Sequence, residues 1–397
     1  MEGSSSEPHV SRLSATRRQG ERVTPLELFF DLVFVLAITQ CTALMSSHPT
    51  WAGLAQGLLV LGVLWWAWVG YAWLTSVIDP EQGAIRLLFF GAMAAMLIAA
   101  LCVPGAFESL ALAFALAIGA FRLLHIALFV LASPDDPDLR RSVAGLAVST
   151  SIAVGLLALA SLFDGLAQAA IWVLALVLDM GVPYFVGTAG WRLVPGHFAE
   201  RHGLIVLIAL GESIVAIGAG ASGHLDLGIG VAAVLGVGLA AGLWWVYFDL
   251  VALISARRLT AAEQGRVQNA LARDSYSYIH LLLVAGIVLA AYGLETALHH
   301  TDERLHTVES FALFGGVALY LLGLVCFRLR HVRTLNRQRL ALAVLLLLLA
   351  PLGTRVPALI PVAVVDALLW AMVAYEMHGY DERRTRLRDE FSVAHGD

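Results

Sequence analysis

The first apolar segment of the chain carries two acids one helical turn apart. Glu27 and Asp31 stand among phenylalanines, leucines and valines in LELFFDLVFVLAITQ (26–40). A separation of four residues places both on one face of a helix. Two such carboxylates repel unless one holds a proton or a cation lies between them. The pair indicates proton or cation handling; alternatively, Glu27 lies at the membrane surface, pairing with Arg22 or capping the helix near Thr24, and Asp31 alone is buried.

Further ionisable side chains are expected inside apolar segments, where each costs about 2.5–3.5 kcal/mol on insertion scales. Such groups usually face the interior of a helix bundle, a partner or water. With Glu27 and Asp31, the candidates for an ion or proton pathway or a buried charge network are Arg122, His125, Asp179, Glu212, Asp249 and His280, and Asp366 is also at this depth.

Arg122 and His125 lie one turn apart in the same segment. An arginine cannot give up its proton there, so it requires a carboxylate, and Asp31 and Asp179 are the candidate partners. A structural ion pair is therefore the alternative to a transport relay. His125 and His280 can titrate near neutral pH and carry protons; alternatively, each is satisfied by a backbone carbonyl.

Glu212 lies about three turns beyond Glu200 and Arg201 in the segment HFAERHGLIVLIALGESIVAIG, between Gly211 and Ser213. Small neighbours let another helix or a hydrated ion approach the carboxylate closely. Glu200 and Arg201, near the start of the segment, are expected to be interfacial anchors. Glu212 thus ranks with Asp31 as a candidate carrier.

The composition of the chain indicates a membrane protein, so these charged residues are expected to lie in membrane-spanning segments. Of 397 residues, 59% are hydrophobic and 14% charged, with a mean hydropathy of +0.80, which is outside the range of soluble domains. About 20 apolar residues are needed for one span. We expect an all-α polytopic membrane protein of about twelve transmembrane helices, at 26–46, 52–75, 86–103, 108–131, 142–162, 168–190, 199–220, 227–254, 275–299, 309–327, 338–352 and 358–377.

The basic residues predict the orientation. All 25 are arginines. If the N-terminus is cytoplasmic, nearly all loop and tail arginines fall on the cytoplasmic side and only Arg304 and Arg355 on the other, as the positive-inside rule requires. We therefore expect a multi-pass protein of the bacterial cytoplasmic (inner) membrane, with both termini in the cytoplasm.

Similar sequence motifs occur in the same order in the two halves of the chain. LWWAWVGY (64–71) is followed later by LWWVYFDL (243–250), and FRLLH (121–125) by FRLRH (327–331). We expect two six-helix repeats of the same orientation, with a solute or ion path where they meet. The tryptophans of these motifs are expected to pack or to lie at the membrane surface. The predicted organisation is a cytosolic tail (1–25), a first repeat (26–190), a second repeat (191–378) and a second cytosolic tail (379–397).

Other classes of site lack their sequence signals. Cys41, Cys102 and Cys326 are far apart and have no metal-ligand spacing, and neither His125 nor His280 belongs to an HxxxH or HExxH pair. We therefore expect no metal and no cofactor. There is no P-loop, and the basic loops suit anionic lipid headgroups, so the expected partner is the lipid bilayer and not nucleic acid. A homo-oligomer is possible.

Two motifs resemble a known family. TPLELFFDLVFVLAITQ (24–40) and ERHGLIVLIALGESIVAIG (200–218) are similar to the opening and second-half motifs of the bacterial low temperature requirement protein A (LtrA) family, and the likeness spans roughly residues 22–378. The family's name refers to growth in the cold. The resemblance implies as family residues Glu27, Phe30, Asp31, Arg122, His125, Glu200, Arg201, Gly211, Glu212 and His280.

The opening helix also resembles that of the endolysosomal potassium/proton channels, which are built from two parallel six-helix repeats. Their motif F-S-D-x-V-F-A-I-A-x-T lines the pore, and Phe29, Asp31, Phe34 and Thr39 fall on its positions at the same spacing. Phe30 replaces the motif serine, and the second half has GLIVLIALGES where a second copy would stand.

These observations favour a pathway for protons or monovalent cations, or for a proton-coupled small solute. One alternative is a membrane-embedded enzyme or cofactor-binding protein, although the sequence favours a protein that is not an enzyme. The other is a structural or accessory membrane protein for cold or stress adaptation.

Overall fold

The computed structural model is built from helices. It describes residues 22–81, 83, 85–132, 137–185, 191–220, 227–299 and 301–394, the stretch after His378 by its backbone alone, and contains no strand within them. Eleven helices in this part of the chain are long and apolar enough to cross a membrane. The chain is a multi-pass membrane protein. Of the two expected tails, residues 1–21 lie outside the described residues, whereas the backbone of 379–394 continues the last helix.

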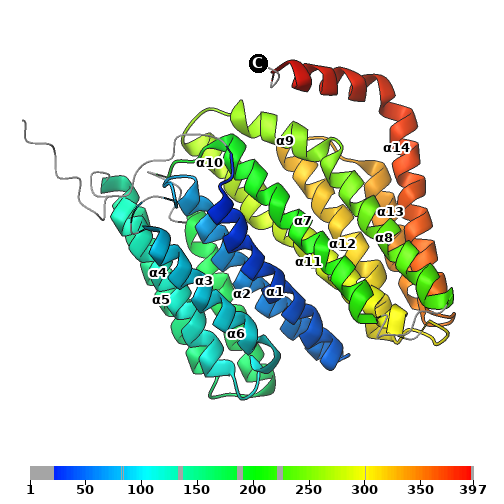
Figure 1. Ribbon diagram of the computed structural model, residues 1–397, viewed down its shortest axis with the longest axis horizontal. Coiled ribbons are helices and arrows are strands. Elements are labelled where there is room, and N and C mark those ends of the chain that lie inside the picture. The colour runs from blue at the N-terminus through cyan, green and yellow to red at the C-terminus, as the bar shows by residue number, and fades with distance from the viewer. Residues whose placement is uncertain are drawn as a thin grey trace, which may run out of the picture. The chain divides into compact units, whose positions relative to one another are not determined.

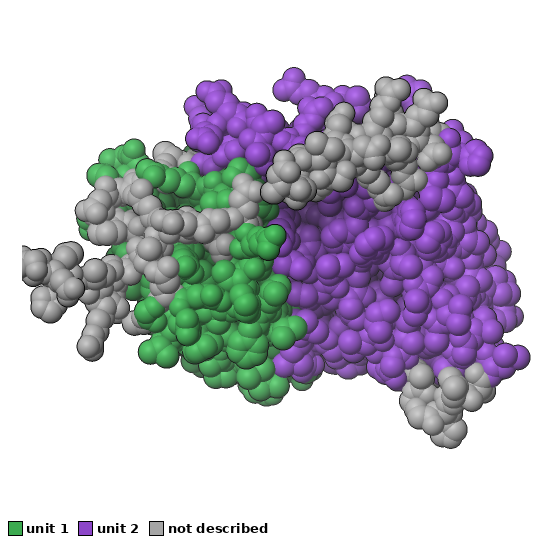
Figure 2. Space-filling view, turned by 45° about the horizontal axis from the view of Figure 1, so that its top comes forward, with its two compact units in different colours: residues 1–34, 63–198 green, residues 35–62, 199–397 purple. Residues whose placement is uncertain are grey.

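The chain divides into two compact units, coloured separately in Figure 2. Unit 1 comprises residues 1–34 and 63–198, and unit 2 comprises 35–62 and 199–397. Three helices contribute residues to both units: α1 (Pro25–Ser47), α2 (Trp51–Thr75) and α7 (Pro195–Gly220). The expected six-helix duplication stays a prediction, because compactness of a unit does not demonstrate repetition.

Unit 1 contains the second half of α2 and four complete helices. They are α3 (Ile85–Cys102), α4 (Ala111–Ala132), α5 (Pro137–Ala160) and α6 (Gly165–Phe185), and the short 3₁₀ helix η1 (Val103–Gly105) follows α3. Consecutive helices pack together, α3 on α4, α4 on α5 and α5 on α6 (Figure 1). This up-and-down order brings positions that are far apart in the sequence into one small bundle.

Unit 2 contains the longer second half of the chain. Its further elements are α8 (Leu227–Phe248), α9 (Val251–Thr260), α10 (Arg266–Ala272), the π-helix η2 (Arg273–Ile279), α11 (His280–His299), α12 (Thr307–Val332), α13 (Arg337–Gly353) and α14 (Leu359–Ala394). Helix α11 packs on α12, α12 on α13, and α14 on α8 (Figure 1).

The segment expected at 338–352 forms α13, which has 17 residues and is not among the eleven helices that are long and apolar enough to cross a membrane. The loops before α12 and after α13 are joined, because Arg304 forms a β-bridge with Pro357 and the Ala358 N–H donates to the Glu303 carbonyl at 2.8 Å. Helices α12 and α13 therefore carry the chain away from this end of unit 2 and back to it.

Two irregularities were not expected from the sequence. The segment 227–254 is interrupted by a turn at Asp249 and Leu250, and the segment 275–299 begins in a π-helix instead of an α-helix. Neither place contains a proline or glycine that would have indicated the irregularity. Irregular backbone at membrane depth is tolerated where protein surrounds it or where it lines a cavity, and both kinds of surroundings are found here, as described below.

Candidate functional site

Glu27 closes the N-terminus of α1 and is completely buried. The Thr24 N–H donates to Glu27 Oε2 at 2.9 Å, and the Glu27 N–H donates to Thr24 Oγ1 at 3.4 Å, which together form a capping box. The other carboxylate oxygen, Oε1, lies 2.8 Å from His197 Nε2. His197 Nδ1 lies in turn 3.4 Å from the Ser76 hydroxyl. The expected cap near Thr24 is present, and the same carboxylate is also buried beside a histidine.

Asp31, one turn further along α1, is also fully buried. Its Oδ1 accepts a hydrogen bond from the indole Nε1–H of Trp68 at 2.9 Å. An indole nitrogen can only donate, so it suits a carboxylate oxygen. Trp68, expected to serve in packing, therefore also binds an acid.

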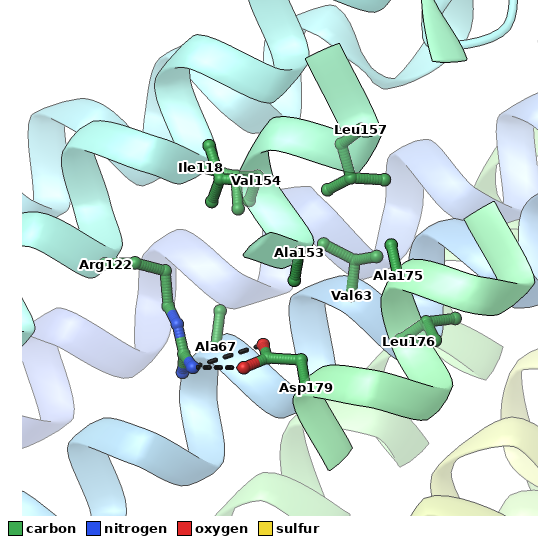
Figure 3. A pocket seen from close by; sticks show the side chains of 10 residues that line it. All are labelled: Val63, Ala67, Ile118, Arg122, Ala153, Val154, Leu157, Ala175, Leu176 and Asp179. Carbon is green, nitrogen blue, oxygen red and sulfur yellow. Dashed lines mark hydrogen bonds and ion pairs between the residues drawn. The ribbon is translucent and has the colours of Figure 1, made fainter. Parts of the chain in front are cut away.

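Arg122 forms an ion pair with Asp179 inside unit 1 (Figure 3). Its Nη2 lies 3.0 and 3.1 Å from the two carboxylate oxygens and 2.6 Å from the Thr150 hydroxyl. These residues come from three helices, α4, α5 and α6. A cavity of about 20 Å³ adjoins the pair, which is room for about one water molecule. Of the two carboxylates predicted as partners for Arg122, the structure pairs it with Asp179.

His125 lies beside this ion pair. Its ring lies 5.1 Å from that of Tyr71, and it contacts the glycine at position 70. A Cβ at Gly70 would lie 2.6 Å from His125 Cε1 and 3.1 Å from Arg122 Nη1. A side chain at position 70 would therefore require His125 or Arg122 to move.

Glu212 lies in unit 2, where it is 2% exposed. Its Oε2 is 2.6 Å from the Thr39 hydroxyl, on the half of α1 that belongs to the same unit. Thr42, almost one turn further along α1, is a second hydroxyl partner, and the carboxylate of Glu295 on α11 is close enough to repel it. Among the described residues, no arginine or histidine forms an ion pair with Glu212.

The Thr39 hydroxyl has two acceptors within reach but only one proton. Its Oγ1 is 2.6 Å from Glu212 and 3.0 Å from the Val35 carbonyl oxygen. When Glu212 is ionised, the hydroxyl donates to it. When Glu212 is protonated, its own O–H donates to Oγ1 while the hydroxyl turns to the carbonyl. Both protonation states of the acid therefore keep a hydrogen bond.

His280 has partners on both ring nitrogens. Nδ1 lies 3.0 Å from the Ser275 carbonyl in the π-helix η2, and Nε2 lies 2.9 Å from the Tyr247 hydroxyl on α8. A carbonyl can only accept, so the neutral ring carries its proton on Nδ1 and accepts from Tyr247. This is the alternative in which a backbone carbonyl satisfies the histidine.

The expected site residues fall into two groups. Unit 1 holds Glu27, Asp31, Arg122, His125 and Asp179, and unit 2 holds Glu212, Asp249 and His280. Asp249, at the turn after α8, borders a cavity with Arg257 and Arg258. Among the described residues, no group of three or more His, Cys, Asp or Glu side chains is arranged to hold a metal ion.

A family model for the bacterial low temperature requirement A protein (LtrA) matches residues 22–374. The chain belongs to the LtrA family. A relative of this LtrA protein is an uncharacterized protein of Rhizobium meliloti (strain 1021), 29% identical over 338 residues, which are 81% of this chain and 81% of the relative. No solved structure matches the chain.

Sequence reasoning missed several partners in this LtrA protein. His197 stands in the quoted segment HFAERHG, three residues before the second-half family motif, so its type and place were a usable signal. Thr150 and Glu295 had no such signal, because the sequence around a single threonine or glutamate in an apolar segment does not indicate which helix its side chain will contact.

Proposed function

We propose that this LtrA-family protein provides a path for protons or a monovalent cation, or couples a proton to the movement of a small solute, across the bacterial inner membrane. In this proposal both termini are cytoplasmic and Glu212 is the carrier. The bilayer is the partner, and assembly of several copies is compatible with the proposal.

The observation that carries the proposal is the contrast between Glu212 and two of the other acids. Asp179 is neutralised by Arg122 and Glu27 contacts His197, whereas Glu212 has hydroxyl partners and a second carboxylate nearby. An ionised carboxylate without a cationic partner is costly at membrane depth. Glu212 must therefore hold a proton or a cation, and it can exchange that ligand without losing its hydrogen bond to Thr39.

The same contact agrees with the resemblance to the potassium/proton channels. Thr39 is a position of their pore-lining motif, and here its hydroxyl contacts Glu212. Ser46, further along α1, is a partner of Glu295. Thr39, Thr42 and Ser46 follow a helical spacing of three and four residues, so α1 presents a row of hydroxyls to the two acids of unit 2.

The test is ion flux in proteoliposomes with imposed gradients of protons, potassium or sodium. The wild type is expected to carry at least one of these ions, and Glu212→Gln, which cannot release a proton, is expected to fall to the level of empty liposomes. Thr39→Val should reduce flux about five- to tenfold through loss of one hydrogen bond. Thr39→Ser, which keeps the hydroxyl, should retain it.

Glu263→Gln is the matched control, because Glu263 is an exposed acid in the loop between α9 and α10. It should leave flux unchanged. Absence of flux of all three ions by the wild type, with no proton-coupled solute uptake, would overturn the proposal; so would wild-type flux by Glu212→Gln.

A structural role remains the second candidate for unit 1. Arg122 and Asp179 neutralise each other and tie α4 to α6, with Thr150 of α5 between them. A pair satisfied in this way holds helices together whether or not an ion passes through unit 2.

A further inference from the structure

Unit 2 contains a cavity of about 450 Å³ that the proposed ion path does not use. Its lining comes from the end of α8, α9, the end of α12, the start of α13, and α14. A volume of this size lies in the range of small-molecule sites. It is large enough for a polar headgroup together with part of an apolar chain.

The charge around this cavity is predominantly positive. Arg257 and Arg258 of α9 and Arg328 of α12 line it, and so do Arg339 and Glu376. The last two form a pair of their own, with Arg339 nitrogens 3.0 and 2.8 Å from the two carboxylate oxygens. Outside this pair, the charged residues that line the cavity are one acid, Asp249, and three arginines. A small anion is the complementary ligand.

A buried histidine in the wall adds an independent observation. His331 lines the cavity at 7% exposure, and neither of its ring nitrogens has a hydrogen-bond partner among the described residues. Buried polar atoms in native proteins are nearly always hydrogen-bonded, and each exception calls for an explanation. A ligand oxygen in the cavity would satisfy one of these nitrogens.

The rest of the wall is apolar. Trp245, Ile254 and Phe327 lie on it among other hydrophobic residues, so the cavity is not suited to a fully hydrated ion. The arginines stand near the ends of α9 and α12 and at the start of α13. Basic pockets between membrane helices are a known way to hold anionic lipid headgroups.

We propose that this cavity binds the phosphate headgroup of an anionic phospholipid. Arg258 and Arg328 bind the phosphate, His331 donates to or accepts from a headgroup oxygen, and the start of the acyl region packs on Trp245 and Phe327. The site is separate from Glu212 and does not depend on ion transport.

The test is native mass spectrometry of the full chain in detergent, with phosphatidylglycerol or phosphatidylcholine added. The wild type should retain phosphatidylglycerol in preference to phosphatidylcholine. The Arg258→Gln/Arg328→Gln double variant should bind phosphatidylglycerol about 30-fold more weakly, the loss expected for two surface arginine contacts. Arg337→Gln, an exposed arginine outside the lining, should bind as the wild type does.

Thermal melting followed by circular dichroism checks that the variants fold, and Arg258→Gln alone provides a milder variant if the double one does not. In a second set of melting measurements, inorganic phosphate is added in place of the lipid. Equal retention of the two lipids, or wild-type binding by the variants, would overturn the proposal. Stabilisation by inorganic phosphate equal to that by phosphatidylglycerol would also overturn it, because the apolar wall would then contribute nothing.

Discussion

Arg122 keeps its charge at any depth in the membrane, so the residues around it must supply the opposite charge. Asp179 does so at 3.0 Å, and Thr150 binds the same Nη2. Glu212 presents the reverse case, a carboxylate that can be neutralised by a proton alone. At the residue scale, this difference in chemistry separates a fixed pair from a candidate carrier.

The pair makes a quantitative prediction. Arg122→Gln and Asp179→Asn should each lower the free energy of unfolding by about 3 kcal/mol, because each leaves a charge without its partner. The double variant should cost less than the sum of the two, which a double-mutant cycle in mixed detergent micelles measures. The pair Arg141 and Asp138, whose side chains are 82% and 65% exposed, is the control and should show almost no coupling. Additive effects at positions 122 and 179 would contradict the ion pair as a stabilising contact.

At the element scale, α11 and α12 pack in close backbone contact. A Cβ at Gly286 would come within 2.7 Å of both the Gly316 carbonyl oxygen and the Tyr320 nitrogen, and one at Gly293 within 2.7 Å of the Leu313 nitrogen. These obstacles are backbone atoms, which cannot rotate away. Small residues thus let two membrane helices touch where no hydrophobic effect drives them together, and this contact supports the helix that carries Glu295.

Gly286→Ala should therefore destabilise the protein by about 1–3 kcal/mol, the usual cost of overpacking. Gly230→Ala on α8, where nothing lies within 4 Å, should leave stability unchanged or raise it, because alanine favours the helix. Thermal unfolding of both variants in detergent provides the comparison. A neutral Gly286→Ala would show that α11 and α12 are further apart than the structure has them.

At the scale of the whole molecule, the number of crossings decides on which side each loop lies. Helix α13 has 17 residues, about 25 Å of helix, close to the minimum for a span. The bridge between Arg304 and Pro357 joins the loops at one end of α12 and α13. If α12 crosses the membrane, α13 must cross it in the opposite direction. Arg304 and Arg355, the two arginines expected outside, then lie on the same side of the membrane.

Cysteine labelling tests this topology. In a cysteine-free background, Arg337→Cys should react with a membrane-impermeant maleimide only in inverted vesicles, and Arg355→Cys only in intact cells, because the two exposed positions flank α13. A cysteine added at the C-terminus should behave like Arg337→Cys. Labelling of positions 337 and 355 from one side would mean that α13 does not cross, and the expected location of the C-terminus would then be wrong.

The sequence by itself determined the class of molecule. Apolar runs of about twenty residues can only become membrane helices, since the backbone must satisfy its own hydrogen bonds in lipid. Helices α1, α2 and α3 accordingly begin and end within one residue of the expected limits. The motifs around Glu27, Asp31 and Glu212 were enough to recognise the LtrA family. A cap near Thr24 was among the alternatives for Glu27, because a cap depends on residues three positions apart.

The tertiary structure decided which charges meet. Helical periodicity gives the face on which a side chain lies but not the helix opposite, so the sequence left both Asp31 and Asp179 as partners for Arg122. The structure pairs Arg122 with Asp179 and Asp31 with Trp68, and places Thr39 against Glu212. It also formed the arginine-lined cavity from helix ends that are far apart in the chain. Contacts of this kind depend on how apolar surfaces of similar composition pack, and lipid-facing and helix-facing leucines look alike in a sequence.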